Sequence, residues 1–196
     1  MPTGVALRDV REQLFAAAER VLLRDGPHAL TSRAVTAEAG CAKGVLHKHF
    51  ADFDAFLAEL VLDRIAQLEG TAAGLLDRAG TGTVAGNLRA ALEGLFGSVA
   101  VAIVGVLIFR DDLRARLRAM RGTPGLPLVT EAAMMISRYL EAERDLGRVV
   151  PEADVTAVAG MLIGSGHLMF ADRSSAPPSS AEVDRMMAAA LAGVVR

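Results

Sequence analysis

Residues 30–50, LTSRAVTAEAGCAKGVLHKHF, decide the fold of the N-terminal part of the chain. Thr31 is placed to cap a helix over Ser32–Ala39, because its hydroxyl can accept from an otherwise unpaired backbone N–H. Gly40 follows, and glycine readily takes the left-handed conformation that ends a helix. A second helix is predicted over Lys43–Phe50. Two short helices around a tight turn indicate a helix-turn-helix, whose second helix typically enters the DNA major groove.

The predicted second helix carries a basic face. Its exposed positions are Lys43, His47, Lys48 and His49, and these two lysines are the only lysines in the chain. Gly44 has no side chain, so a phosphate strand can approach the backbone closely there. A solvated helix surface explains two charges equally well. The turn chemistry and the following Phe50 favour a surface that faces DNA.

Charge and composition describe an ordinary globular protein. The 196 residues carry a formal net charge of −2 and are 52% hydrophobic, which allows one or two small domains with a sizeable core. Overall charge gives no nucleic-acid signal. Within residues 30–50, however, Arg33, Lys43 and Lys48 stand against Glu38, a modest local excess of +2.

The single cysteine and the apolar runs indicate a cytoplasmic protein. Because Cys41 is the single cysteine, an internal disulfide is ruled out. We expect Cys41 to be a small buried hydrophobic residue rather than a redox sensor. Residues 1–4 lack the basic region of a secretory signal. The longest apolar run, Val99–Phe109, is about half the length that spans a bilayer, so it predicts a fully buried helix.

Helical periodicity extends over the whole chain, and no convincing strand is visible, so the predicted fold class is all-α. Leu7–Asp25 is predicted as an amphipathic helix that ends at Gly26-Pro27 and supports the helix-turn-helix. Further helices are predicted over Phe53–Leu68 (capped by Asp52), Thr83–Phe96, Ser98–Phe109, Asp111–Met120, Leu128–Leu146, Glu152–Asp172 (opened by Pro151) and Ala181–Val195. A flexible connection is predicted over Gly70–Gly86 and a loop over Ser174–Ser180.

Two predicted C-terminal helices carry surfaces that suit self-association. Gly160, Gly164 and Ser165 place small residues on one face, which lets helices approach closely. The last helix has a broad apolar face formed by Val183, Met186, Met187, Ala190, Leu191 and Val194. Packing within one chain remains the alternative explanation for both surfaces.

Signals for catalysis or cofactors are weak. No nucleophile–base pattern and no metal-ligand spacing is visible, and His47 and His49 face different sides of a helix. Gly80-Thr-Gly82 with Gly86 approaches a dinucleotide-binding motif, but that motif needs a preceding strand, and within this connection the preceding residues Thr71–Arg78 are predicted as helix. No catalytic residue, cofactor or metal site is therefore predicted, and an all-α enzyme using His28 or His167 is a remote alternative.

The helix-turn-helix resembles the DNA-binding domain of the tetracycline-repressor (TetR) family of bacterial transcription regulators. The matching positions, in register, are Thr31, Arg33, Val35, Ala39, Gly40, Gly44, Leu46 and Phe50. The resemblance is strong over Val10–Leu60 and consistent in layout over the rest. Ala42, His47 and Phe53 depart from the family pattern, which usually has Ser, Tyr and Lys at those positions, where they meet the phosphate backbone.

This resemblance implies a DNA-binding domain over residues 1–50 and a helical ligand-binding and dimerisation domain over residues 51–196. It implies a homodimer formed through the last two helices, at about residues 152–172 and 181–195, and double-stranded DNA as partner. The residues expected to contact DNA are Thr31, Ser32, Arg33, Lys43, Gly44, Val45, His47, Lys48 and His49.

A pocket for a small, mostly apolar ligand is also implied. The middle helices are rich in methionine and aromatic side chains, which tolerate irregular packing but are more often core than pocket. The residues expected to line the pocket are Phe96, Phe109, Met134, Met135, Tyr139, Met161, His167 and Phe170. The leading hypothesis is therefore a ligand-responsive homodimeric repressor. The departures at Ala42, His47 and Phe53 motivate the alternative, a helical small-molecule or partner-binding protein that has lost specific DNA binding.

Overall fold

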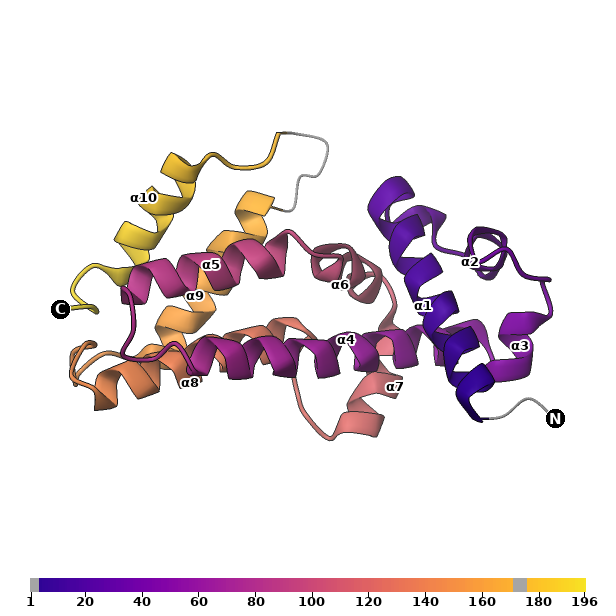
Figure 1. The fold of residues 1–196 in the computed structure, drawn as a ribbon, viewed down its shortest axis with the longest axis horizontal. Helices are drawn as coiled ribbons and strands as arrows, with labels where there is room; N and C mark the ends of the chain where they lie inside the picture. Colours follow the sequence, from indigo (N-terminus) through magenta and orange to yellow (C-terminus); the bar gives the residue numbers. More distant parts are fainter. Residues whose placement is uncertain (1–3, 171–175) are drawn as a thin grey trace. The chain divides into compact units, whose positions relative to one another are not determined.

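A computed structural model describes residues 4–170 and 176–196, with side chains from residue 10 onward. These residues form helices joined by short turns, with a single antiparallel bridge between Val149 and Val195 and no strand (Figure 1). The all-α prediction is confirmed. The helices are α1 Gly4–Asp25, η1 Pro27–Ala29, α2 Ser32–Glu38, α3 Val45–His49, α4 Phe53–Leu76, α5 Val84–Phe96, α6 Ala100–Ile108, α7 Asp111–Arg121, α8 Val129–Asp145, α9 Val155–Phe170 and α10 Ser180–Leu191.

The chain divides into two compact units. The first comprises the described residues up to Arg64 together with Ala102–Leu126, and the second comprises Ile65–Val101 with the described residues from Pro127 onward. The α4 helix therefore contributes residues to both units. The functional boundary near residue 50 stays a prediction.

Aromatic packing holds the first unit together. Phe50, which directly follows α3, is 3% exposed and meets the Phe56 ring edge-on with 5.1 Å between ring centroids. Phe15 of α1 lies 5.6 Å from Phe56 and 6.0 Å from Phe50. Such rings bury much apolar area, and pairs of them prefer offset or edge-to-face arrangements, which fixes how the helices meet. The short α3 is thereby joined to α1 and α4.

The α4 helix is longer than the sequence predicted. It continues through Gly70 and Gly74 to Leu76, which confirms the helix predicted from Thr71 as far as Leu76 and confines the predicted flexible connection to the residues after it. Leu68 and Leu75 lie on this extension and are buried in the core of the second unit. Tertiary packing of this apolar face outweighs the low helix propensity of the two glycines.

The helix from Ala100 to Ile108 is less buried at its end than predicted. Ile103 and Leu107 are buried, but Ile108 is 45% exposed and Phe109, beyond the helix, is 80% exposed.

In the described parts of the chain, no single helix has both the length and the hydropathy to cross a bilayer. The consecutive helices α5 and α6 reach that length only as a pair bent by 60°.

The C-terminal helices differ from prediction at their ends. Pro151 and Glu152 form a turn, and α9 begins at Val155 because Asp154 accepts from the Ala157 N–H at 3.0 Å and caps it. The predicted helix end at Asp172 and the first part of the predicted loop Ser174–Ser180 lie outside the described residues.

The last helix ends at Leu191, four residues earlier than predicted. Val150 N–H donates to the Val194 carbonyl at 2.9 Å, and Arg196 N–H donates to the Arg148 carbonyl at 3.1 Å. These bonds pair the C-terminal residues with the turn before α9. The backbone groups of Val194 and Arg196 are therefore satisfied outside a helix.

Candidate functional site

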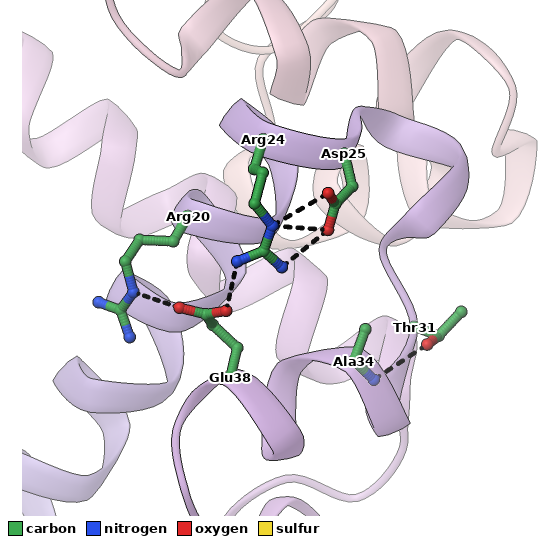
Figure 2. Close-up of polar contacts among 6 residues, drawn as sticks. All are labelled: Arg20, Arg24, Asp25, Thr31, Ala34 and Glu38. Atoms are coloured by element: carbon green, nitrogen blue, oxygen red, sulfur yellow. Dashed lines mark hydrogen bonds and ion pairs between the residues drawn. The ribbon is translucent and has the colours of Figure 1, made fainter.

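The turn between α2 and α3 has the geometry that its sequence predicts. The Thr31 hydroxyl accepts from the Ala34 N–H at 3.1 Å and caps α2 (Figure 2). Gly40 adopts φ 67°, its N–H donates to the Ala37 carbonyl, and the Cys41 N–H donates to the Thr36 carbonyl at 3.0 Å. This is the Schellman arrangement, in which a left-handed glycine closes the last turn of a helix.

The α3 helix starts later than predicted. It runs over Val45–His49, and Lys43 and Gly44 belong to the preceding turn. No side chain of the described residues caps its first turn, because Ala42 carries no acceptor and Gly44 carries no side chain. The helix therefore depends on its neighbours for support, since one turn and a half of isolated helix is unstable in water.

The predicted DNA-contacting residues lie on this helix-turn-helix with mixed exposure. Thr31, Arg33, Lys43, Gly44, His47 and Lys48 are exposed, whereas Ser32, Val45 and His49 are partly buried. Among the residues that the structure describes, Arg33, Lys43 and Lys48 form no ion pair. Three such cations on one short segment form a surface that suits an anionic partner.

Two arginines of α1 neutralise the acidic residue of this segment. Glu38, at the end of α2, accepts from Arg20 Nε and from Arg24 Nη1, each at 2.7 Å (Figure 2). These two hydrogen bonds from α1, Arg20 first and Arg24 second, hold the pKa of Glu38 below its ordinary value. The sequence count set Glu38 against the basic residues, but the structure places its charge in a pair with α1.

The start of α4 is joined to α7 by two ion pairs. Arg116 binds both carboxylate oxygens of Asp52 at 2.8 and 3.0 Å, and Arg110 binds Asp54 at 2.7 Å. Phe53 stacks on Phe56 with 5.6 Å between ring centroids, and the Arg110 guanidinium lies 5.7 Å from the Phe53 ring. Phe53 thus packs within the first unit, which gives this departure from the family pattern a structural explanation.

Asp52 should titrate at unusually low pH. The hydrogen bonds from Arg116, followed by the bond from the Ala55 N–H, lower its pKa from 3.8 to about 2. Because the folded pKa lies below the unfolded one, the pair stabilises the fold above pH about 4 and loses this effect as the pH falls towards about 2. We expect Arg116→Gln to move the Asp52 midpoint back towards 3.8 in a carboxyl NMR titration. An unchanged midpoint would show that the pair does not form in solution.

The residues predicted to line a pocket are dispersed. Met135 and Tyr139 are buried in the core of the second unit, and Phe96 stacks on Phe170 with 5.3 Å between ring centroids. Met134 and Met161 are exposed by 43% and 52%, and His167 is partly buried. Phe109 belongs to the first unit and is mostly exposed. The structure therefore brings together only part of this set.

A buried polar network organises the second unit. The Tyr139 hydroxyl donates to Glu143 Oε1 at 2.5 Å and accepts from Asn87 Nδ2 at 3.0 Å. Glu143 is fully buried, and its Oε2 accepts from the Gly80 N–H at 3.3 Å and lies 3.4 Å from Arg148 Nε. Burial first, and then the bond to Glu143, raises the pKa of Tyr139 to about 12.

An open cleft of about 300 Å³ lies beside this network, between the second half of α4 and α5. Its lining residues are Thr71, Gly74, Leu75, Arg78, Asn87, Ala90 and Ala91. No pattern in the sequence marks them as a site, since small residues on two separate helices give no local signal. Among the described residues, no three His, Cys, Asp or Glu side chains gather as a possible metal site.

Comparison with known proteins agrees with the geometry of the helix-turn-helix. Residues 14–60 match the family model described as bacterial regulatory proteins, tetR family. Residues 14–60 thus belong to a TetR-type N-terminal domain. The resemblance noted from residues 30–50 is thereby confirmed, and the first unit carries the family's DNA-binding domain.

Proteins of known structure share the fold over nearly the whole chain. NemR of E. coli, in its reduced form, matches with a TM-score of 0.73 and 17% identity, covering 95% of this chain and 98% of that one. A TetR-family regulator from Agrobacterium tumefaciens matches with a TM-score of 0.72 and 14% identity, covering 97% and 100%. FadR from Bacillus subtilis, in complex with stearoyl-CoA, matches with a TM-score of 0.67 and 16% identity, covering 93% of this chain and 98% of that one. No curated protein sequence matches the chain.

Proposed function

We propose that this protein is a TetR-family regulator, a cytoplasmic, ligand-responsive repressor that binds a two-fold symmetric operator as a homodimer. Residues 1–50 would bind DNA, and residues 51–196 would dimerise and hold the ligand. The observation that carries the proposal is the exposed set of Arg33, Lys43 and Lys48 on a helix-turn-helix whose single acid, Glu38, is neutralised by α1. Lysine and arginine on such a surface neutralise phosphates and release counterions.

An unpartnered face of α9 supports the homodimer. Gly160 and Gly164 are exposed, and a side chain added at either would meet nothing within 4 Å among the described residues. Met161 is 52% exposed and Leu168 is 81% exposed on the same helix. Small residues beside exposed apolar ones suit close packing against a second copy, and a two-fold dimer presents two recognition helices about one DNA turn apart.

The cleft between α4 and α5 supports ligand binding. Its volume of about 300 Å³ is at the lower end of small-molecule sites. FadR, a structural relative, was solved with stearoyl-CoA, and another relative is a gamma-butyrolactone receptor. A ligand would regulate DNA binding only if it bound the two dimer states with different affinity.

Selection of duplexes from a random library tests the proposal, with the dimer measured by sedimentation. A repressor dimer should enrich a two-fold symmetric site, and its affinity for that site should fall steeply with salt. Failure of a folded dimer to enrich any duplex, also after refolding without ligand, would favour the alternative of a protein that has lost specific DNA binding. The proposed absence of catalysis would be contradicted by turnover that disappears when His28 and His167 are replaced.

Two glycines of the turn should respond oppositely to alanine. Gly40 has φ 67°, so Gly40→Ala should lower the free energy of unfolding by roughly 1–2 kcal/mol. Gly44 has φ −77° and open space around it, so Gly44→Ala should leave stability unchanged or raise it by about 0.5 kcal/mol. We expect Gly44→Ala nevertheless to weaken binding to the selected duplex, because a methyl group occupies the path of the phosphate strand. Urea denaturation and duplex titration measure the two effects, and full affinity of Gly44→Ala would remove Gly44 from the interface.

A further inference from the structure

Arg11 of α1 makes contacts at the end of the recognition helix α3. Its Nη1 donates to the carbonyl oxygen of His49 at 3.2 Å, and its guanidinium carbon lies 4.4 Å from the centroid of the Phe50 ring. Its Nη2 forms an ion pair with Glu59 of α4. The Arg11 side chain is 34% exposed, so this charge is partly withdrawn from water. One side chain thus contacts the end of α3 and pairs with α4.

The end of α3 needs such a contact. His49 is the last residue of a helix of five residues, and the last carbonyls of a helix lack partners within it. A guanidinium there satisfies one carbonyl and interacts favourably with the negative end of the helix dipole. Phe50 is only 3% exposed, and a cation over its ring adds an attraction that aligns the two side chains.

Glu59 determines where the guanidinium lies. It is part of α4 and faces Arg11 within the first unit, so it supplies the counter-charge that a partly buried guanidinium requires. The planar guanidinium has several donors in fixed directions, which allows Arg11 to meet Glu59 and the His49 carbonyl together. A lysine would offer a single point charge in its place.

We propose that Arg11 is a positioning residue for DNA recognition, which fixes the end of α3 so that Lys48 is presented in one orientation. This inference rests on the proposed function. Arg11 acts through His49 and Phe50 and contacts no phosphate. Glu59 is its counter-ion and shares the role.

Hydrogen exchange in the DNA-free protein tests the positioning directly. In Arg11→Met, which keeps an unbranched apolar side chain, we expect the amides of Lys48 and Phe50 to exchange about tenfold faster. These amides donate to Gly44 and Leu46 at the end of the recognition helix. Arg24→Met is the matched control, because Arg24 also leaves α1 and binds an acid but contacts α2 instead. Equal acceleration of all amides in α1, α2 and α3 would overturn the proposal and assign Arg11 to general stability.

Salt-dependent titration of the duplex selected by the wild-type protein separates positioning from direct binding to phosphate. Arg11→Met should weaken binding about tenfold while leaving the slope of log affinity against log salt unchanged. Arg11→Lys should restore part of the affinity, and Arg138→Met, at an exposed position on α8, should bind as the wild type does. A slope reduced by about 0.9 for each protomer would show that Arg11 meets a phosphate and would overturn the proposal.

A second variant covers the case in which Arg11→Met does not fold. Glu59→Gln retains Arg11 and removes its counter-charge, and it should produce the same local exchange pattern with a smaller amplitude. Unchanged exchange at Lys48 and Phe50 in this variant would contradict the role given to the pair. If the wild-type protein selects no duplex, the proposed function fails, while the exchange experiment still decides whether Arg11 positions α3.

Discussion

Replacing Lys43 and Lys48 together by alanine should reduce affinity for the selected operator about a thousandfold. A symmetric homodimer would then lose four cationic contacts to DNA, at roughly 1 kcal/mol each, and about 1.4 kcal/mol corresponds to a factor of ten. Both side chains are exposed, and neither forms an ion pair among the described residues, so their removal should not unfold the domain. The weaker affinity therefore reports binding rather than stability.

Fluorescence anisotropy titrations at several salt concentrations provide the measurement. The slope of log affinity against log salt should fall by about 0.9 for each phosphate that the variant no longer neutralises. Arg138→Ala on α8 is the matched control, because it removes a positive charge far along the chain from the turn. A double variant with the wild-type slope would show that these lysines do not bind phosphate.

The single variants separate the two lysines. Lys48→Ala should weaken binding nearly uniformly across duplex sequences if Lys48 binds phosphate. Lys43 is able to bind either a base or a phosphate. A changed sequence preference on repeating the selection with Lys43→Ala would assign it to a base, and a uniform decrease in affinity would assign it to the backbone.

The local features of the helix-turn-helix were predictable from sequence. The Thr31 cap and the left-handed Gly40 depend on neighbours only a few residues away, so the local sequence predicts them, and the burial of Phe50 follows from its apolar side chain at the end of the helix-turn-helix. The start of α3 was misplaced by two residues. Ala42 and Gly44 offer no capping signal, and the turn therefore extends to Gly44.

Longer-range features were not predictable. Gly70 and Gly74 lower local helix propensity, yet Leu68 and Leu75 hold α4 in a core that is formed by distant segments. Arg11 bonds to His49 across 38 positions, and no periodicity in the sequence indicates that pair.

The charge balance of the turn was also misjudged from sequence, because the ion pairs that set it join residues distant along the chain. The bond between Arg116 and Asp52 spans 64 positions, and the bond between Arg24 and Glu38 spans 14. A count within residues 30–50 therefore underestimates how fully the acid of the turn is compensated. The cleft between α4 and α5 also depends on tertiary packing, since its residues come from both helices.

Glu143→Ala should lower the free energy of unfolding of the second unit by about 3 kcal/mol, the cost of breaking a buried charged network from one side. Glu143 is fully buried and binds Tyr139, Gly80 and Arg148. Alanine would leave the Tyr139 hydroxyl without its acceptor and would open a cavity. Urea denaturation followed by circular dichroism measures the change. Glu141→Ala, an exposed position on the same helix, should change stability by less than about 0.5 kcal/mol.

Tyr139 reports on the same network independently of unfolding. It is the only tyrosine in the chain, so ultraviolet absorbance follows its ionisation without interference. Its pKa should fall from about 12 towards the ordinary value of 10.0 in Glu143→Ala, remaining above it because burial still disfavours the phenolate. A variant of wild-type stability with an unchanged Tyr139 pKa would show that the network does not form.

The polar network is connected to the cleft through Asn87. Asn87 lines the cleft and donates to the Tyr139 hydroxyl at 3.0 Å as well as to the Thr81 carbonyl at 2.9 Å. Removal of Glu143 frees the hydroxyl to rotate and weakens one of the bonds that orient the Asn87 amide. A ligand in this cleft should therefore bind Glu143→Ala more weakly than it binds Glu141→Ala, even where both variants are folded. Equal affinities would separate the cleft from the network and leave Glu143 a purely structural residue.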